Sequence, residues 1–257
     1  MSDAGGRALV ALTLLTTLSL LASAQETVGV ARHALAVDAT RIQPFGRMYD
    51  MIVHTRDSSI VIGQREVSLS AATYSNAPMW LLVETRGGPI AVSESLFVTL
   101  GLRPAHWSSA LGVARLGAEF VGDSIYGAVT TPAGKQNIVA LGRPDLLVSA
   151  SMPEMILPLL PLASTWADSV NVLSVDLGTT QVIPAELAVV GEDSFPLDSS
   201  TTQAAWVVAL RSGDRHVLYW VDKADGTVLR VQQALPSHVG VELEYRLRRD
   251  SGGASPR

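Results

Sequence analysis

The stretch RHVLYWVDKADGTVLRVQQ, residues 215–233, has the pattern of a β-hairpin. Two runs rich in β-branched and aromatic residues flank Lys223-Ala224-Asp225-Gly226. An Asp-Gly pair in this position is a strong short-range hairpin signal. The following run, residues 238–247, alternates strictly, with Val239, Val241, Leu243, Tyr245 and Leu247 on one face and Glu242, Glu244 and Arg246 on the other. One buried and one solvated face is typical of an antiparallel sheet.

The same strand-and-turn pattern continues upstream. Strands are predicted at residues 48–56, 60–72, 78–86, 91–100, 110–121, 124–131, 135–141, 168–177, 181–190 and 204–212. Turn residues separate them every ~8–12 residues, as in antiparallel meanders, and Pro184 predicts that strand 181–190 is an edge or bulged strand. We therefore expect a mainly β fold, with a single curved antiparallel sheet resembling a half-barrel and a short helical insertion. A β-sandwich is the alternative that the sequence leaves open.

The insertion is predicted in SMPEMILPLLPLAS, residues 151–164. Ser151 and Glu154 have the spacing of a capping box, and Pro153 falls in the first turn, where its missing N–H costs nothing. Pro158 and Pro161 then end a helix of one or two turns. A turn is expected just before it, at residues 144–147.

Seven apolar side chains of this segment require burial: Met152, Met155, Ile156, Leu157, Leu159, Leu160 and Leu162. Each gains ~1.5–3 kcal/mol on leaving water, so exposing all of them would offset the ~5–15 kcal/mol stability of a whole domain. The segment is predicted to plug the concave face of the sheet, to form a lid over an apolar cavity, or to face another protein. Flexible methionines suit a surface that repacks around varied apolar groups. The candidate ligand-binding residues are Met152, Met155, Ile156, Leu159 and Leu160.

The N-terminus has the pattern of an export signal. Arg7 precedes an uncharged apolar run from Ala8 to Ala22, and Ala22-Ser23-Ala24 supplies the small residues of a cleavage site. The run is shorter than the ~20 residues that span a bilayer. We expect a signal peptide over residues 1–24, an irregular segment over 25–46, one β-rich domain over 47–248 and a disordered tail over 249–257. The protein is expected to be periplasmic or extracellular, without a stable membrane anchor.

The sequence offers no motif for catalysis or metal binding. It contains no cysteine, and none of its five histidines stands at a metal-binding spacing from another. A G-x-S-x-G elbow and an S-x-x-K motif are also absent. The net charge of −5, without long charged runs, argues against a nucleic-acid partner. We expect a non-catalytic protein with no cofactor, no metal site and no catalytic residues.

The placed strands resemble a known architecture. The meander from about Tyr49, the insertion at residues 144–164, LYWVDKADGTVLRVQ (218–232) and VELEYRL (241–247) resemble uncharacterised exported bacterial domains of unknown function. The resemblance covers residues 47–248, and its hairpin motif W-V-D-x-x-x-G-x-x-x-R is carried by Trp220, Asp222, Gly226 and Arg230. Those domains are similar in architecture to periplasmic lipoprotein carriers, whose half-barrel encloses an apolar cavity closed by short helices. No functional residue of the carriers is transferred to this chain.

Two functions follow as expectations. The first is an exported cell-envelope protein that binds an apolar small molecule or lipid in a half-barrel cavity. The second is a structural or interaction protein of envelope assembly, whose partner is an envelope protein and which has no small-molecule ligand. An enclosed apolar cavity of a few hundred Å³ favours the first, and a solid core favours the second.

Overall fold

The computed structural model describes residues 35–89, 91–141, 146–176, 179–196, 201–213, 215–234 and 241–248. The predicted signal peptide, residues 25–34 of the predicted irregular segment and the predicted tail lie outside these ranges. Within them, η1 (Ala39–Arg41) is a single 3₁₀ turn, and β1 begins at Phe45.

The described residues form two hairpin-connected series of strands. The first series is β1 (Phe45–His54), β2 (Ser59–Tyr74), β3 (Ala77–Arg86), β4 (Val92–Thr99), β5 (Pro104–Leu111), β6 (Ala114–Val121), β7 (Ser124–Thr131) and β8 (Gly134–Leu141). After β9 (Leu146–Leu147), α1 (Met152–Ile156) and η2 (Leu157–Leu159), the second series is β10 (Ala167–Asp176), β11 (Thr179–Pro196), β12 (Thr202–Ser212), β13 (Arg215–Asp222), β14 (Val228–Ala234) and β15 (Glu242–Leu247).

These fifteen strands make one sheet in the order β8-β7-β6-β5-β4-β3-β2-β1-β15-β14-β13-β12-β11-β10-β9. The first and last long strands pair in its middle, where Tyr49 lies opposite Leu247. Every pairing is antiparallel except that of β9 with β10. The predicted single curved sheet with a short helical insertion is confirmed, and the β-sandwich alternative is wrong because the strands are hydrogen-bonded in one continuous series.

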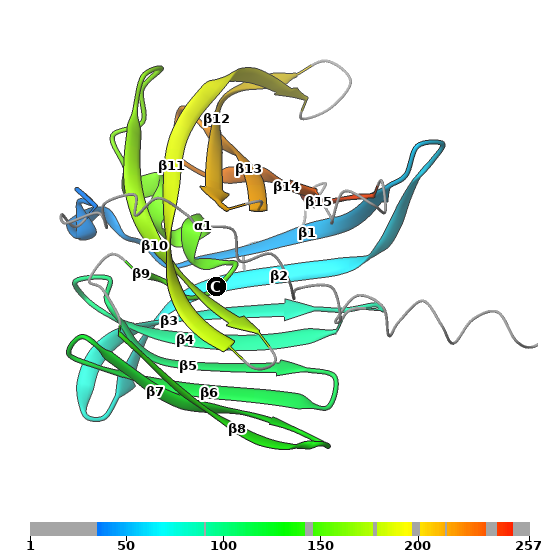
Figure 1. Ribbon diagram of the computed structural model, residues 1–257. Helices are drawn as coiled ribbons and strands as arrows, with labels where there is room; N and C mark the ends of the chain where they lie inside the picture. The colour runs from blue at the N-terminus through cyan, green and yellow to red at the C-terminus, as the bar shows by residue number, and fades with distance from the viewer. Residues whose placement is uncertain are drawn as a thin grey trace, which may run out of the picture.

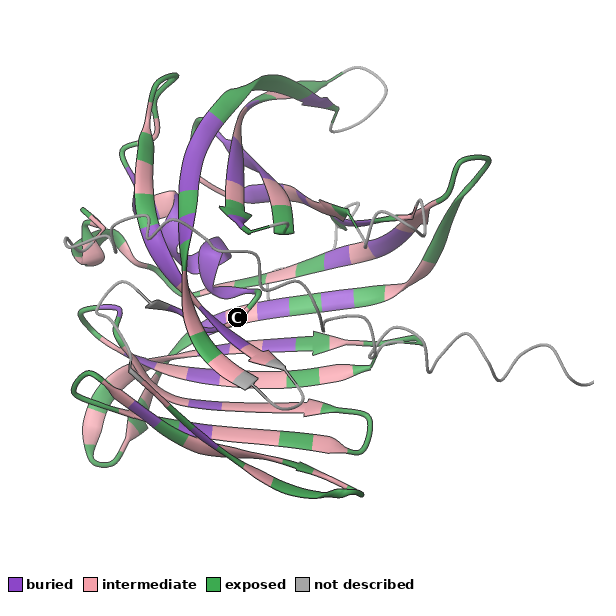
Figure 2. Ribbon diagram, viewed as in Figure 1, coloured by how far each residue is buried: buried purple, intermediate pink, exposed green. Residues whose placement is uncertain are grey.

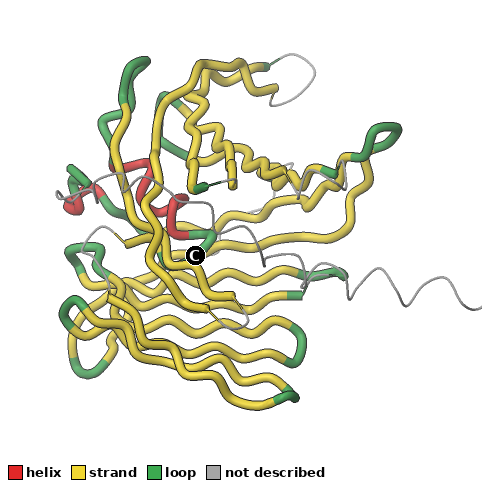
Figure 3. Tube along the Cα trace, viewed as in Figure 1, coloured by secondary structure: helices red, strands yellow, loops and turns green. Residues whose placement is uncertain are grey.

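The sheet curls so that its two halves face each other with α1 between them (Figure 1). In the coloured trace the short helical segment lies inside the curl of strands (Figure 3). Buried residues concentrate on the inner faces of the central strands and on α1 (Figure 2). The main core cluster contains residues of both halves, including Tyr49, Leu82, Val208 and Val228, together with Met155 from α1.

Two details of the strand prediction are wrong, and a third is confirmed in one of its two alternatives. The predicted strand 110–121 is the end of β5, a turn at Gly112 and Val113, and β6, because Gly112 adopts a φ of +55° and reverses the chain. Leu146 and Leu147 form β9 rather than a turn; residues 144–145 lie outside the described ranges. Finally, β11 is not an edge strand, because it is paired with both β10 and β12, but it is bulged, which is the other form that was predicted.

Pro184 is compatible with an inner strand because of where the neighbouring strand ends. The β11–β12 ladder runs from Glu186, opposite Arg211, to Pro196, so Pro184 lies just beyond it and faces only β10. A missing N–H therefore interrupts no ladder between two neighbours. The bulge of β11 occurs further on, between Val189 and Gly191.

Candidate ligand-binding site

The short helix α1 enters the interior of the curled sheet. Its residues Met152 to Ile156 are all buried. The predicted capping box is wrong: Ser151 is the N-cap residue but its side chain makes no capping hydrogen bond, and its hydroxyl lies 2.8 Å from that of Ser149. The Glu154 carboxylate is used elsewhere, in an ion pair with the sheet.

The five predicted ligand-binding residues are brought together, but inside the core. Met152, Met155, Ile156, Leu159 and Leu160 are each at most 6% exposed and belong to the main core cluster. Two of them, Met155 and Leu159, also line a mainly polar groove of about 580 Å³ bounded by residues 40–45 and by the turn before β14. A role of these five residues in ligand binding stays a prediction.

The turn of the 215–233 hairpin helps to hold this segment in place. The turn lies at the predicted position, with Gly226 at a φ of +77° and its N–H donating to the Asp222 carbonyl at 3.0 Å. A Cβ atom on Gly226 would lie 2.7 Å from Cα of Pro158 in η2. The hairpin backbone therefore packs directly on the helical insertion.

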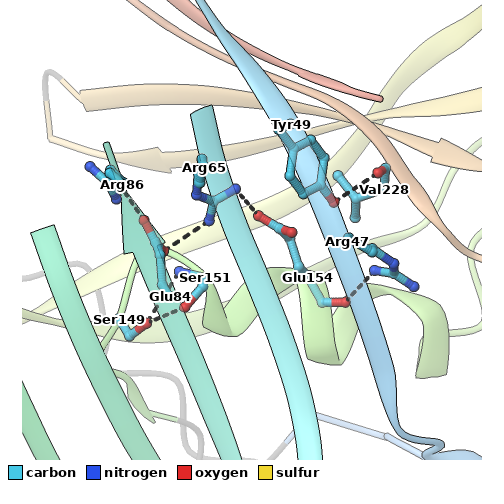
Figure 4. Close-up of polar contacts among 9 residues, drawn as sticks. All are labelled: Arg47, Tyr49, Arg65, Glu84, Arg86, Ser149, Ser151, Glu154 and Val228. Atoms are coloured by element: carbon cyan, nitrogen blue, oxygen red, sulfur yellow. Dashed lines mark hydrogen bonds and ion pairs between the residues drawn. The ribbon is translucent and has the colours of Figure 1, made fainter. Parts of the chain in front are cut away.

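Beneath α1 lies a network of buried charges that the sequence prediction missed (Figure 4). The Arg65 guanidinium on β2 is paired with Glu154 of α1 and with Glu84 of β3, the latter at 3.0 Å. Glu84 also pairs with Arg86. The side chains of Arg65, Glu84 and Glu154 are at most 2% exposed. The helix is thus attached to the sheet by a buried ion pair as well as by apolar packing.

Electrostatics keeps this network charged. Burial disfavours the charged form of Glu84, but the Arg65 and Arg86 guanidiniums more than offset it and lower its pKa to about 2. Burial likewise opposes the charge on Arg65, yet Glu154 and Glu84 raise its pKa well above the usual value. Because the folded-state pKa of Glu84 is depressed, its stabilising contribution is complete above pH ~4.5 and is lost as the pH falls toward 2.

A partly open cavity of about 240 Å³ lies beside this network. Its walls are mostly apolar and come from strands β9 to β15, from β2 and β3, and from the segment before α1; they include Leu147, Val172, Leu173, Ile183, Leu210 and Val231. Pro153 contributes from α1. Such an apolar enclosure with a few polar groups is typical of small-molecule sites, although its volume lies just below their usual range.

Part of the cavity lining is polar. Arg65, Arg86 and Tyr245 lie together, with Tyr219, at one wall, and other polar residues also line the cavity: Ser149, Ser212, Arg215 and Gln233. The Tyr245 ring packs against both guanidiniums, with its centroid 4.8 Å from Cζ of Arg65 and 5.5 Å from Cζ of Arg86. Burial raises the pKa of Tyr219 and of Tyr245, so both phenols keep their protons at neutral pH.

Two polar atoms at this wall are buried without a hydrogen-bond partner among the described residues: Nε of Arg65 and the hydroxyl of Tyr245. Buried polar groups are normally paired, and an unpaired one costs ~1–3 kcal/mol. Both are N–H or O–H donors. They are therefore unused donors of two residues that line the cavity, but neither atom is exposed at the cavity surface.

A further buried carboxylate, that of Glu244, lies on the outer face of the sheet, against prediction. Glu244 was expected to face solvent but its side chain is 0% exposed, because it is covered by three partners, His54, Arg230 and Arg246, at 3.0, 2.8 and 2.7 Å. The alternation of residues 238–247 predicted the correct face for Glu244. The long side chains that pair with it on that face nevertheless exclude water from its carboxylate. His54, expected on the solvated face, is partly exposed, and its Nε2 lies 3.0 Å from a carboxylate oxygen of Glu244.

Among the described residues, no three His, Cys, Asp or Glu side chains are grouped so that they could hold a metal ion. None of the helices in the described part of the chain has the length and hydrophobicity that crossing a bilayer requires.

The fold and this interior define a class: an open, curled antiparallel sheet whose concave side holds a short helix and a largely apolar cavity. Among solved structures, the chain is similar to a beta-barrel-like protein of the domain of unknown function DUF1849 from Brucella abortus, with a TM-score of 0.52 and 11% identity over 81% of this chain and 97% of that one. At this identity the similarity shows a shared fold alone.

A second solved structure, the hypothetical lipoprotein YmcC from Escherichia coli K12, matches with a TM-score of 0.34 and 14% identity over 82% of this chain and 90% of that one. No family model matches the sequence, and no curated protein matches it significantly.

Proposed function

We propose that this protein is an exported, non-catalytic cell-envelope protein that binds an apolar or lipid-like molecule inside its half-barrel. The observation that carries the proposal is the cavity of about 240 Å³, with mainly apolar walls, beside the helical insertion. Export rests on the signal-like pattern of residues 1–24. An interior without a cavity would have favoured a structural or interaction role instead.

The alternative is a structural or interaction role in envelope assembly without a small-molecule ligand. It is favoured by the burial of Met152, Met155 and Ile156, which belong to the main core cluster and not to the cavity wall. A helix that only fills the concave side would stabilise the sheet without serving as a lid.

Filling the cavity distinguishes these two functions. We expect Val172→Trp to weaken binding of the apolar dye N-phenyl-1-naphthylamine at least ten-fold, because the indole occupies space that the dye needs. Val172 lines the cavity and is only partly buried, so the fold should lose no more than the ~1–3 kcal/mol typical of overpacking. Dye fluorescence titrations measure binding, and thermal melts measure folding.

The matched control is Val139→Trp, because Val139 is 70% exposed on β8, away from the cavity. It should bind the dye as the wild type does. Leu210→Trp fills the cavity from β12 and replaces Val172→Trp if that variant does not fold. Equal dye binding by the wild type and a folded cavity-filled variant would contradict the proposal, as would the absence of saturable binding in the wild type.

A further inference from the structure

We propose that the cavity binds the anionic group of a single-chain amphiphile, held by Arg86, Tyr245 and Arg65, with the apolar chain against the opposite wall. This inference rests on the proposed function and names the chemical class of its ligand. It is carried by the charges that line the cavity, by the unpaired donors at one wall and by the cavity's volume.

The charges lining the cavity have one sign. Three arginines, Arg65, Arg86 and the exposed Arg215, line it, and none of the described residues at its wall is an aspartate or a glutamate. Glu84 and Glu154 pair with Arg65 but do not line the cavity. The acids therefore hold the guanidiniums in place without lining the cavity, so its charged lining residues are all cationic.

The donors at this wall are incompletely used. Nε of Arg65 and the hydroxyl of Tyr245 belong to side chains at most 3% exposed, and neither has a hydrogen-bond partner among the described residues. Arg86 donates through Nε to Glu84, and its guanidinium faces the Tyr245 ring. Both donor atoms are fully buried, so the two side chains must shift for an anionic group at this wall to accept their hydrogen bonds. Such a shift would pair donors that otherwise stay unpaired in the interior, and charge-assisted bonds of this kind are among the strongest in proteins.

The volume of the cavity limits the size of the ligand's apolar chain. At ~30 Å³ of liquid volume per water molecule, 240 Å³ corresponds to about eight waters. A carboxylate or sulfate on one short chain fits such a space, whereas a two-chain lipid does not. Apolar residues of β10 and β11, Leu173 and Ile183, supply the surface for the chain.

The test compares octanoate, octyl sulfate, octanol and octylammonium by isothermal titration calorimetry on the full chain. We expect at least one of the two anions to bind ten- to hundred-fold more tightly than octanol, the effect of gaining charge-assisted hydrogen bonds, and octylammonium to bind more weakly than octanol. The stronger anion then identifies the headgroup as carboxylate or sulfate.

Two variants locate the headgroup. Arg86→Met should reduce anion affinity roughly ten-fold or more, a much larger loss than the loss of octanol affinity in the same variant. Tyr245→Phe keeps the ring, removes only an unpaired hydroxyl, and should weaken anion binding without lowering the melting temperature. Tyr49→Phe is the matched control: it removes a hydroxyl that donates to the Val228 carbonyl at 3.0 Å and does not line the cavity, so it should affect stability and not anion affinity.

The outcomes separate this inference from the proposed function. Octanol binding as tightly as both anions, or anion affinity unchanged in both Arg86→Met and Tyr245→Phe, would overturn the anionic subsite and leave apolar ligand binding intact. The absence of binding by all four compounds would overturn both.

Discussion

Arg65→Met is expected to destabilise the protein by about 3–5 kcal/mol, the usual result of removing one partner from a buried ion pair. The variant leaves Glu154, which is 0% exposed, without its cation and leaves Glu84 with Arg86 alone. Both carboxylates would then have to take up protons or admit water. Urea unfolding followed by tryptophan fluorescence measures the loss.

The matched control for this change is Arg211→Met. Arg211 pairs with Glu186 at 3.8 Å, and both side chains are about half exposed, so its loss should cost no more than ~1 kcal/mol. Replacing the three most buried members of the network together, with Arg65→Met, Glu84→Met and Glu154→Leu, should recover part of the stability, because apolar residues can substitute for a buried ion network. An Arg65→Met variant within 1 kcal/mol of the wild type would show that the network does not anchor the helix.

Gly226→Ala is the second substitution with a large expected effect: it should lower the free energy of unfolding by at least ~2 kcal/mol. A non-glycine residue at a φ of +77° is itself strained, at a cost of ~1–3 kcal/mol. In addition the new Cβ would lie 2.7 Å from Cα and 2.8 Å from Cβ of Pro158, so the hairpin turn and η2 must move apart. Thermal and urea unfolding both report the change.

Gly122→Ala separates the two contributions. Gly122 has a φ of +58° in the β6–β7 turn, and a Cβ there would meet nothing within 4 Å. It should therefore show the conformational cost alone and destabilise less than Gly226→Ala. Equal losses for the two variants would contradict the close packing of the hairpin turn on the helical insertion.

Most of the sheet could be predicted from the sequence because its strands alternate and its turns carry glycine, proline, aspartate, asparagine or serine. The terminal hairpin and the 151–164 helix lie where local patterns place them. β5 was missed because its apolar pattern continues through Gly112 into β6, and only the backbone conformation of that glycine separates the two strands. The pairing of β1 with β15 depends on contacts across nearly the whole chain, which local patterns do not contain.

The candidate site was only partly accessible to the same reasoning. Arg65 stands two residues before Val67 and four before Leu69, so extending the alternation of β2 would have placed it on the inner face. The burial pattern of β3 likewise places Glu84 with Leu82. Charged residues at inward-facing positions of the strands are the sequence signal that could have indicated this buried network. Their pairing with Glu154 could not be predicted, because it depends on how the helix is oriented inside the sheet.

The central claim is that a ligand occupies the interior cavity, and methyl-resolved NMR tests it most directly. In a titration of the labelled protein with octanoate, the account predicts saturable shifts of the methyl signals of Val172, Leu173 and Leu210, which line the cavity. The signals of Val113 and Val139, at least 70% exposed on the outside, should not move. Shifts confined to such exposed methyls, or no shifts at saturating octanoate, would contradict the claim.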